Sequence, residues 1–401
     1  MGFKGIHIFL IFLILFSFIL PIVEAKTADE WITEGINLYN VGKYEEANKT
    51  FDEAINASDE ALKFNPQNAD AWYNKGFALK NFGRYDDAIK AYDEALKINP
   101  QYAHAWYDKG LVLSDIGRYN EAINAYDEAL KINPQDALAL YERGYAFNNL
   151  GRYDDAIKAY DEALKINPQF AQAWYEKGFT FINFGRNDDA IKAYDEALKI
   201  NPQFAQAWDE KGLALIGLER YDDAIKAYDE ALKINPQYAQ AWFNKGAVLG
   251  GLGRNDEAIK AYDDALKINP QYAIAWFNKG VALGGLGRYD DAIKALDEAL
   301  KIDSQDADAW FYKGVALDHL RRYDEGIKAY DEALKINPQY AQAWSNKGFD
   351  FAGLKRYDEV INASDEALKI NQQDAQAWAN KGAALGVLGR NDEAIKAYDE
   401  P

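Results

Sequence analysis

Residues 69–102 read ADAWYNKGFALKNFGRYDDAIKAYDEALKINPQY, and this stretch decides the fold. The same 34-residue unit begins again at positions 103, 137, 171, 205, 239, 273, 307 and 341, and a shortened copy begins at 375. Residues 154–174 and 188–208 are identical over all 21 positions. A fixed period of this length is typical of a stacked array, in which each unit is one helical hairpin that buries its apolar face only against its neighbours.

Each unit contains two helical windows separated by a turn. In the first window Trp72 and Gly76 lie four residues apart, which places them on one stripe of an α-helix. The second window, residues 88–96, repeats that helical spacing. Between the windows, Gly83 suits the left-handed position that ends a helix. Pro100 ends the second helix, because the residue before a proline is kept out of the α region.

This pattern resembles the tetratricopeptide repeat, and the resemblance extends over residues 28–400. It implies an all-α fold, a right-handed superhelical solenoid of tandem helix–turn–helix hairpins. It also implies that extended peptides are held on the inside of the superhelix. Some family members carry a catalytic domain beside the repeats, but here we expect none, because no residues remain to build one. In the quoted unit, the positions that match the family motif are Trp72, Gly76, Ala88, Tyr92, Ala95 and Pro100.

The sequence departs from the family pattern at a few positions. Lysine or arginine, as at Lys75, stands where the family usually has leucine, and we expect its stem to be buried. Other departures gather in the C-terminal units, which we therefore expect to be less regular and looser. These are Ser304, Gly326, Val360, Ser364 and Gln372.

Residues 1–25 precede the array and form a leader. Lys4 comes before an apolar run at 6–20, and Val23 and Ala25 are small residues placed as in a cleavage site, so the segment has the form of a secretory signal peptide. The alternative is an uncleaved membrane anchor, because residues 6–23 would span about 27 Å as a helix. Both interpretations place the repeats outside the cytoplasmic membrane, either secreted or at the cell surface.

The array itself is expected to have three parts. Residues 28–68 form an extended first unit, 41 residues long, which suits a capping role. Residues 69–374 form nine units of 34 residues, and 375–401 form a truncated final unit. No solvating C-terminal helix follows, so either a partner or another copy of the chain covers this end, or the array continues in a longer protein.

Composition excludes several function classes. The chain has no cysteine, which excludes disulfides and thiolate metal sites, and we predict no catalytic residue, metal or cofactor. Its net charge of −19 argues against nucleic acid and anionic membrane surfaces as partners. The repeated carboxylates of the second helix are expected to form a solvated face with weak i,i+4 ion pairs.

The informative variation lies on the first helix, opposite the tryptophan stripe. An aromatic residue recurs there through most of the array, and two glycine pairs replace larger residues beside it, which suggests a hollow. The alternative is that these rings only pack adjacent first helices. The candidate ligand-binding residues are Tyr73, Phe77, Tyr107, Tyr141, Tyr175, Phe243, Phe277, Phe311, Gly250, Gly251, Gly284 and Gly285.

The sequence therefore predicts an exported, non-enzymatic scaffold that binds protein or peptide segments in a concave groove. The expected ligand is extended, with apolar or aromatic side chains and a basic flank. A membrane would be contacted only through the N-terminal segment. The alternative is a structural spacer of the cell envelope that self-associates through its uncapped C-terminal end. The amino-acid sequence of the repeat resembles that of large prokaryotic arrays, archaeal ones in particular.

Overall fold

The computed structural model describes residues 26–399, and every regular element in that range is an α-helix. The leader falls outside the described residues, so its role as signal or anchor stays a prediction. Between residues 26 and 399 no helix combines the length and the apolar character needed to cross a bilayer. The chain forms two compact units, which meet in sequence between Phe184 and Gly185. 

The even-numbered helices are the first helices of the repeats and the odd-numbered ones are the second helices. The described helices are α2 (Ala28–Asn40), α3 (Tyr44–Phe64), α4 (Ala69–Asn81), α5 (Tyr85–Ile98), α6 (Ala103–Asp115), α7 (Tyr119–Ile132), α8 (Ala137–Asn149), α9 (Tyr153–Ile166), α10 (Ala171–Asn183), α11 (Asn187–Ile200), α12 (Ala205–Ile216), α13 (Tyr221–Ile234), α14 (Ala239–Gly251), α15 (Asn255–Ile268), α16 (Ala273–Gly285), α17 (Tyr289–Ile302), α18 (Ala307–His319), α19 (Tyr323–Ile336), α20 (Ala341–Gly353), α21 (Tyr357–Ile370), α22 (Ala375–Val387) and α23 (Asn391–Asp399).

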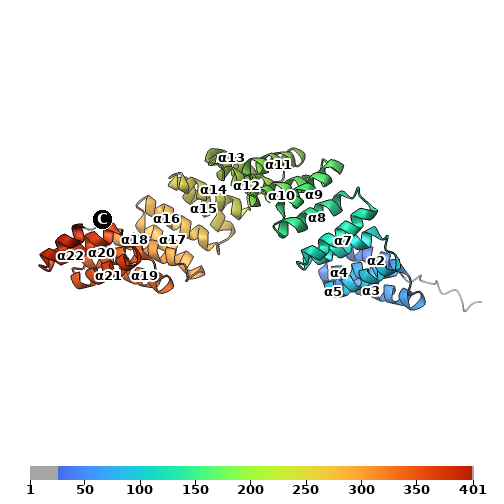
Figure 1. The fold of residues 1–401 in the computed structure, drawn as a ribbon, viewed down its shortest axis with the longest axis horizontal. Coiled ribbons are helices and arrows are strands. Elements are labelled where there is room, and N and C mark those ends of the chain that lie inside the picture. Colours follow the sequence, from blue (N-terminus) through green and yellow to red (C-terminus); the bar gives the residue numbers. More distant parts are fainter. Residues whose placement is uncertain (1–25, 400–401) are drawn as a thin grey trace, which may run out of the picture. The chain divides into compact units, whose positions relative to one another are not determined.

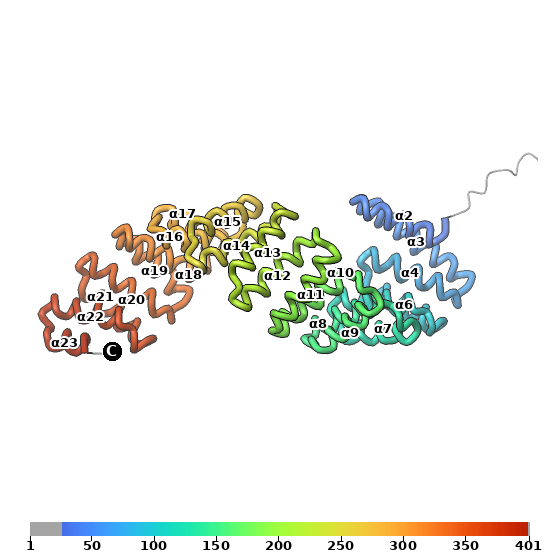
Figure 2. The backbone as a smooth tube through the Cα atoms, turned by 90° about the horizontal axis from the view of Figure 1, so that it is seen from above, coloured from blue at the N-terminus to red at the C-terminus, as the bar shows by residue number. Residues whose placement is uncertain are grey.

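Within each compact unit, consecutive helices pair as hairpins and each hairpin packs on the next (Figure 1). Figure 2 shows the same alternation of first and second helices along the chain, for example from α12 to α17. The predicted all-α class and its tandem helix–turn–helix arrangement are confirmed. The first hairpin differs in length, because α3 has 21 residues where α5 has 14.

The turn inside each hairpin is made by one residue in the left-handed conformation. Gly83 has φ 81°, and the N–H of the next residue, Arg84, donates to the carbonyl of Leu79 at 2.9 Å, which closes the end of α4. Glycine holds this position in most hairpins. The exceptions are Glu219, Arg321 and Lys355, with φ 58°, 59° and 61°.

In the core of most hairpins, a glycine of the first helix packs against an aromatic ring of the second helix. Tyr92 of α5 is fully buried, and a Cβ added to Gly76 of α4 would lie 2.8 Å from its ring carbons. Gly110 and Tyr126 repeat this contact in the next hairpin, where the corresponding distance is 2.5 Å. A larger residue in place of either glycine would therefore push the two helices apart.

An ion pair joins each hairpin to the one before it. Lys109 Nζ of α6 lies 2.6 Å from Asp93 Oδ1 of α5, and the lysine side chain is 18% exposed, so its stem is buried as expected. The prediction of i,i+4 ion pairs on the second helices is wrong. Lys97 instead bonds Glu94, three residues earlier, at 2.5 Å, because Asp93 is already held by the next hairpin.

Candidate functional site

Tyr73 shows how the predicted aromatic row is built. It lies half-buried on α4, and its hydroxyl donates to Asp108 Oδ2 of α6 at 2.8 Å. Its ring centroid lies 5.0 Å from that of Tyr102, just before α6, and 5.9 Å from that of Tyr92. The ring therefore packs against its own hairpin and the next one, and it stays partly exposed.

The other predicted residues before Phe184 follow the same plan. Tyr141 on α8 lies 4.9 Å from Phe170 and 6.0 Å from Tyr160, between ring centroids. The remaining three are also half-buried on their first helices. They are Phe77, Tyr107 and Tyr175.

Carboxylates form a second row, one residue after the aromatic one. Asp108 is neutralised by Lys80, whose Nζ lies 2.8 Å from Asp108 Oδ1. Glu142, one hairpin later, is half-buried and pairs with no lysine or arginine of residues 26–399. Burial, together with the negative charges of Asp115 and Glu176, raises the pKa of Glu142 to about 7. Burial raises the pKa of Glu176 as well.

After Gly185 the predicted aromatic row consists of phenylalanines. Phe243 lies 5.0 Å from Tyr272 and 6.1 Å from Tyr262, between ring centroids. Phe311 makes the matching contacts with the aromatic residues of its own and the next hairpin. Phe277 differs, because its hairpin has no buried tyrosine, and its ring packs beside Leu296 and edge-on to Tyr312 at 5.7 Å.

The two predicted glycine pairs have different surroundings. A Cβ on Gly250 would lie 3.5 Å from the hydroxyl of Tyr262, so this space is filled. A Cβ on Gly284 would meet no atom within 4 Å. Here α16, α17 and α18 enclose a hollow of about 260 Å³. Gly251 and Gly285 are exposed at the ends of their helices.

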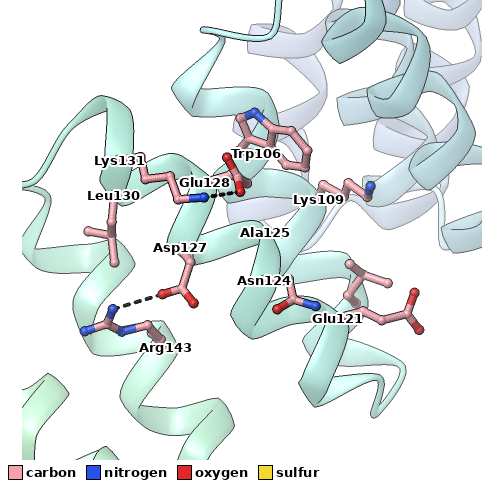
Figure 3. A pocket seen from close by; sticks show the side chains of 11 residues that line it. Trp106, Lys109, Glu121, Asn124, Ala125, Asp127, Glu128, Leu130, Lys131 and Arg143 are labelled. Carbon is pink, nitrogen blue, oxygen red and sulfur yellow. Dashed lines mark hydrogen bonds and ion pairs between the residues drawn. The ribbon is translucent and has the colours of Figure 1, made fainter.

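Larger depressions lie on the other side of the hairpins, beside the tryptophans. Figure 3 shows one of about 730 Å³ between α6, α7 and α8, where Arg143 lies 3.0 Å from Asp127. Trp106 borders it, and its Nε1 donates to the carbonyl of Pro100 at 3.1 Å. Equivalent depressions recur beside Trp276 and Trp378. Because they repeat with the unit, we assign them to the scaffold rather than to a unique site.

A pair of carboxyl groups lies buried at the α18–α20 contact. The position of a Cβ on Gly326 would be 2.3 Å from Asp350 Oδ2 and 2.7 Å from Asp318 Oδ1. Asp350 is fully buried, and Tyr330 donates its hydroxyl hydrogen to Asp318. Burial and the charge of Asp318 raise the pKa of Asp350 to about 9, and burial raises the pKa of Asp318 to about 6. The pair is thus arranged to share a proton at neutral pH.

Neither array histidine joins a catalytic or metal cluster. His104 is exposed on α6, and the His319 ring stacks on that of Tyr289 at 4.4 Å. No group of three or more metal-ligating side chains occurs among residues 26–399.

Three features of the site escaped the sequence prediction, although their signals are visible in the repeat. The acidic row appears as Asp108, Glu142, Glu176 and Glu210 at one repeat position. Leu296 interrupts the buried tyrosines, and that change accompanies the hollow. Gly326 marked a loosened contact in the sequence, but the two aspartates that fill the space beside it lie on other helices.

Antiparallel hairpins at a 34-residue period define a helical-repeat protein. The chain belongs to the tetratricopeptide repeat family, whose members are typically non-enzymatic and mediate protein–protein interaction. Models described as "Tetratricopeptide repeat" match residues 69–102, 107–169, 141–205, 175–239, 210–273, 243–306 and 277–341.

Several solved structures are similar to this chain. MamA is 31% identical, with 41% of this chain and 96% of that chain covered and a TM-score of 0.40. YrrB, described as a TPR protein with an unusual peptide-binding site, is 22% identical, with coverages of 47% and 96% and a TM-score of 0.43. The C-terminal part of a TPR repeat-containing protein from Cytophaga hutchinsonii is 14% identical, with coverages of 60% and 98% and a TM-score of 0.53. The comparison with curated proteins found no match.

Proposed function

We propose that this chain is a non-enzymatic scaffold whose first helices bind extended protein segments. The observation that carries the proposal is Glu142, a half-buried carboxylate with no basic partner among the described residues. The pKa of the neighbouring Tyr107 is raised mainly by burial, and the negative charges of Glu142 and Asp108 raise it further. Keeping an un-neutralised carboxylate partly buried costs folding energy, and a bound cation would remove that cost.

The ligand that fits this surface carries a lysine or arginine next to aromatic or apolar side chains. The basic group would neutralise Glu142 through a charge-assisted hydrogen bond. The apolar side chains would lie on the exposed edges of Tyr107 and Tyr141, which offer contact area at a small cost in side-chain entropy. The net charge of −19 would speed association with a basic segment, mostly at low salt.

The test is a selection of random linear peptides displayed on phage against residues 26–401. Enriched peptides are synthesised with a fluorophore, and their affinity is measured by anisotropy at low and high salt. Glu142→Gln should weaken a groove-binding peptide roughly thirtyfold, because the peptide's cation loses its partner. Glu45→Gln, the same change at an exposed position of α3, serves as the control and should leave affinity unchanged. Failure to enrich any peptide would reject the scaffold function.

We also propose that the array works outside the cytoplasmic membrane, on the strength of the leader sequence alone. Sequencing the N-terminus of the protein from its native source should give Lys26 or a close neighbour. Met1 on membrane-bound protein would instead favour the anchor, and protein found in the cytoplasm would contradict both forms of export.

A self-associating structural component is the second candidate. Apolar side chains of α22 and α23 are widely exposed, with Val387 at 62%, Ile395 at 58% and Tyr398 at 56%. Two copies that cover this face would bury them. Sedimentation velocity should then show a dimer that Ile395→Glu disrupts, whereas a monomer at all accessible concentrations would remove this candidate.

A further inference from the structure

The hollow between α16, α17 and α18 results from one substitution within the repeat. In most other hairpins a buried tyrosine fills this region, as Tyr262 does beside Gly250. In the α16–α17 hairpin the residue is Leu296, which still packs under Gly280 but lacks the outer part of the phenol. Gly284 adds no side chain of its own, so the space that Tyr262 occupies in the preceding hairpin stays open here.

The walls of this hollow are almost entirely apolar. Val281 of α16, Leu296 of α17 and Val315 of α18 line it. Tyr289 and His319 form one side as a stacked pair, with centroids 4.4 Å apart and ring planes at 6°. The volume of about 260 Å³ exceeds the roughly 150 Å³ that admits benzene in an engineered protein cavity. The hollow is therefore large enough for one leucine or phenylalanine side chain.

One exposed carboxylate lies on the first helices around the hollow. The exposed residues of α14, α16, α18 and α20 include no lysine or arginine, and their only carboxylate is Asp308. Asp308 lies one helical turn before Tyr312, a lining residue that is 38% exposed. The lysines of α16 and α18, Lys279 and Lys313, pair with Asp263 and Asp297 of the preceding second helices, each at 2.6 Å. Asp308 accepts a hydrogen bond from the Tyr340 hydroxyl at 2.7 Å but forms an ion pair with no lysine or arginine of residues 26–399, so an occupant with a basic neighbour could pair with it.

We propose that this hollow is an anchor pocket for one leucine or phenylalanine of an extended protein segment that carries lysine or arginine beside it. The inference rests on the proposed scaffold function and adds a defined contact to it. The apolar side chain enters between Gly284 and Val315, and the basic residue lies over Asp308. Tyr312 covers the rim of the occupied pocket.

Two variants fill the pocket by enlarging one of its lining residues. Leu296→Tyr restores the residue that Tyr262 and Tyr330 provide in the neighbouring hairpins. Gly284→Ile introduces the residue found at the same repeat position in Ile182 and Ile216. The matched control is Gly386→Ile on α22, the same change at the same repeat position, outside the pocket.

The experiment selects phage-displayed random peptides that bind residues 26–401 but not the Leu296→Tyr variant. We expect enrichment of peptides with one leucine or phenylalanine beside a lysine or arginine. In fluorescence anisotropy, Gly284→Ile should weaken such a peptide about thirtyfold or more, and so should alanine in place of its apolar residue. Gly386→Ile should have no effect, and thermal unfolding should show all three variants folded.

The two possible failures are distinguishable. If peptides bind the wild-type chain but none is lost on Leu296→Tyr, the pocket is overturned and the scaffold function stands. If selected peptides carry no such apolar residue, or retain their affinity for Gly284→Ile, the pocket is likewise overturned. If no peptide binds the wild-type chain at all, both proposals fail.

Discussion

At the scale of single residues, Gly326 makes room for the buried carboxyl pair of Asp318 and Asp350. This predicts a strong energetic coupling between substitutions at Gly326 and at Asp350. Gly326→Ala alone would place its methyl group 2.3 Å from Asp350 Oδ2 and should destabilise the protein by roughly 1–3 kcal/mol. Asp350→Ala removes a fully buried carboxyl, whose burial costs free energy, and should therefore be neutral or stabilising. In the double variant the methyl group still lies 2.7 Å from Asp318 Oδ1, so its cost should be smaller than in the single variant but not abolished. Urea unfolding of the four proteins gives the coupling energy, and additive effects would show that the groups do not meet.

The same pair predicts a dependence of stability on pH. The raised pKa values mean that the folded protein binds more protons than the unfolded chain, whose carboxyls titrate near pH 4. The contribution of the pair is therefore most favourable below that pH and is lost as the pH rises towards about 9. Stability relative to Asp350→Ala should fall between pH 5 and pH 9, as measured by unfolding in urea. An equal pH profile for the two proteins would contradict the shared proton.

How far the sequence predicted the site can be judged residue by residue. Helical periodicity placed Tyr73 and Tyr141 on the surface of the first helix, because the rotation of about 100° per residue determines which face of a helix a residue occupies. It could not say how much of each ring is covered, since the covering side chains Tyr102 and Phe170 come from the following hairpin. It also could not separate Gly250 from Gly284, because the difference depends on a side chain of another helix.

At the scale of the helical hairpin, the left-handed turn position distinguishes well-formed hairpins from strained ones. A side chain in this conformation costs roughly 1 kcal/mol, which glycine avoids. Arg321→Gly should therefore stabilise the α18–α19 hairpin by about that amount, and Gly287→Arg should destabilise the preceding hairpin similarly. Thermal unfolding and hydrogen exchange of the amides of α18 and α19 check the pair. A loss of stability on Arg321→Gly would mean that the arginine side chain makes a compensating contact.

At the scale of the whole molecule, local packing predicts unfolding in stages. Each hairpin packs mainly on its sequence neighbours, so the free energy of unfolding is distributed among hairpin contacts. The region from α18 to α21 combines Arg321 and Lys355 at left-handed turns with the buried carboxyl pair. Hydrogen exchange at pH 8 should therefore find these helices the least protected of the helices between α12 and α21. Uniform protection that is lost in a single step would contradict this.

The fold was predictable at this scale because the repeat supplies the same evidence many times. The tryptophan stripe, the turn glycine and the proline each recur in almost every unit, so an exception such as Leu140, which is buried in the tryptophan position, changes nothing. The site is unlike the fold in this respect. It depends on residues that differ from the repeat at a single position, such as Leu296 and Asp350. The other units give no evidence about the role of such a residue, which follows only from the side chains that surround it in space.

The ion pair between consecutive hairpins allows whole repeats to be deleted from or duplicated in the gene without loss of the contact. Lys211 bonds Asp195, and Lys245 bonds Asp229, in each case at 2.6 Å. If residues 205–238 were deleted, Phe204 would join Ala239, and Lys245 would meet Asp195 in an unchanged junction. Recombination between coding segments as alike as those for 154–174 and 188–208 would produce such deletions and the matching duplications. We therefore expect natural alleles to differ in length by whole units of 34 codons, each keeping an intact array.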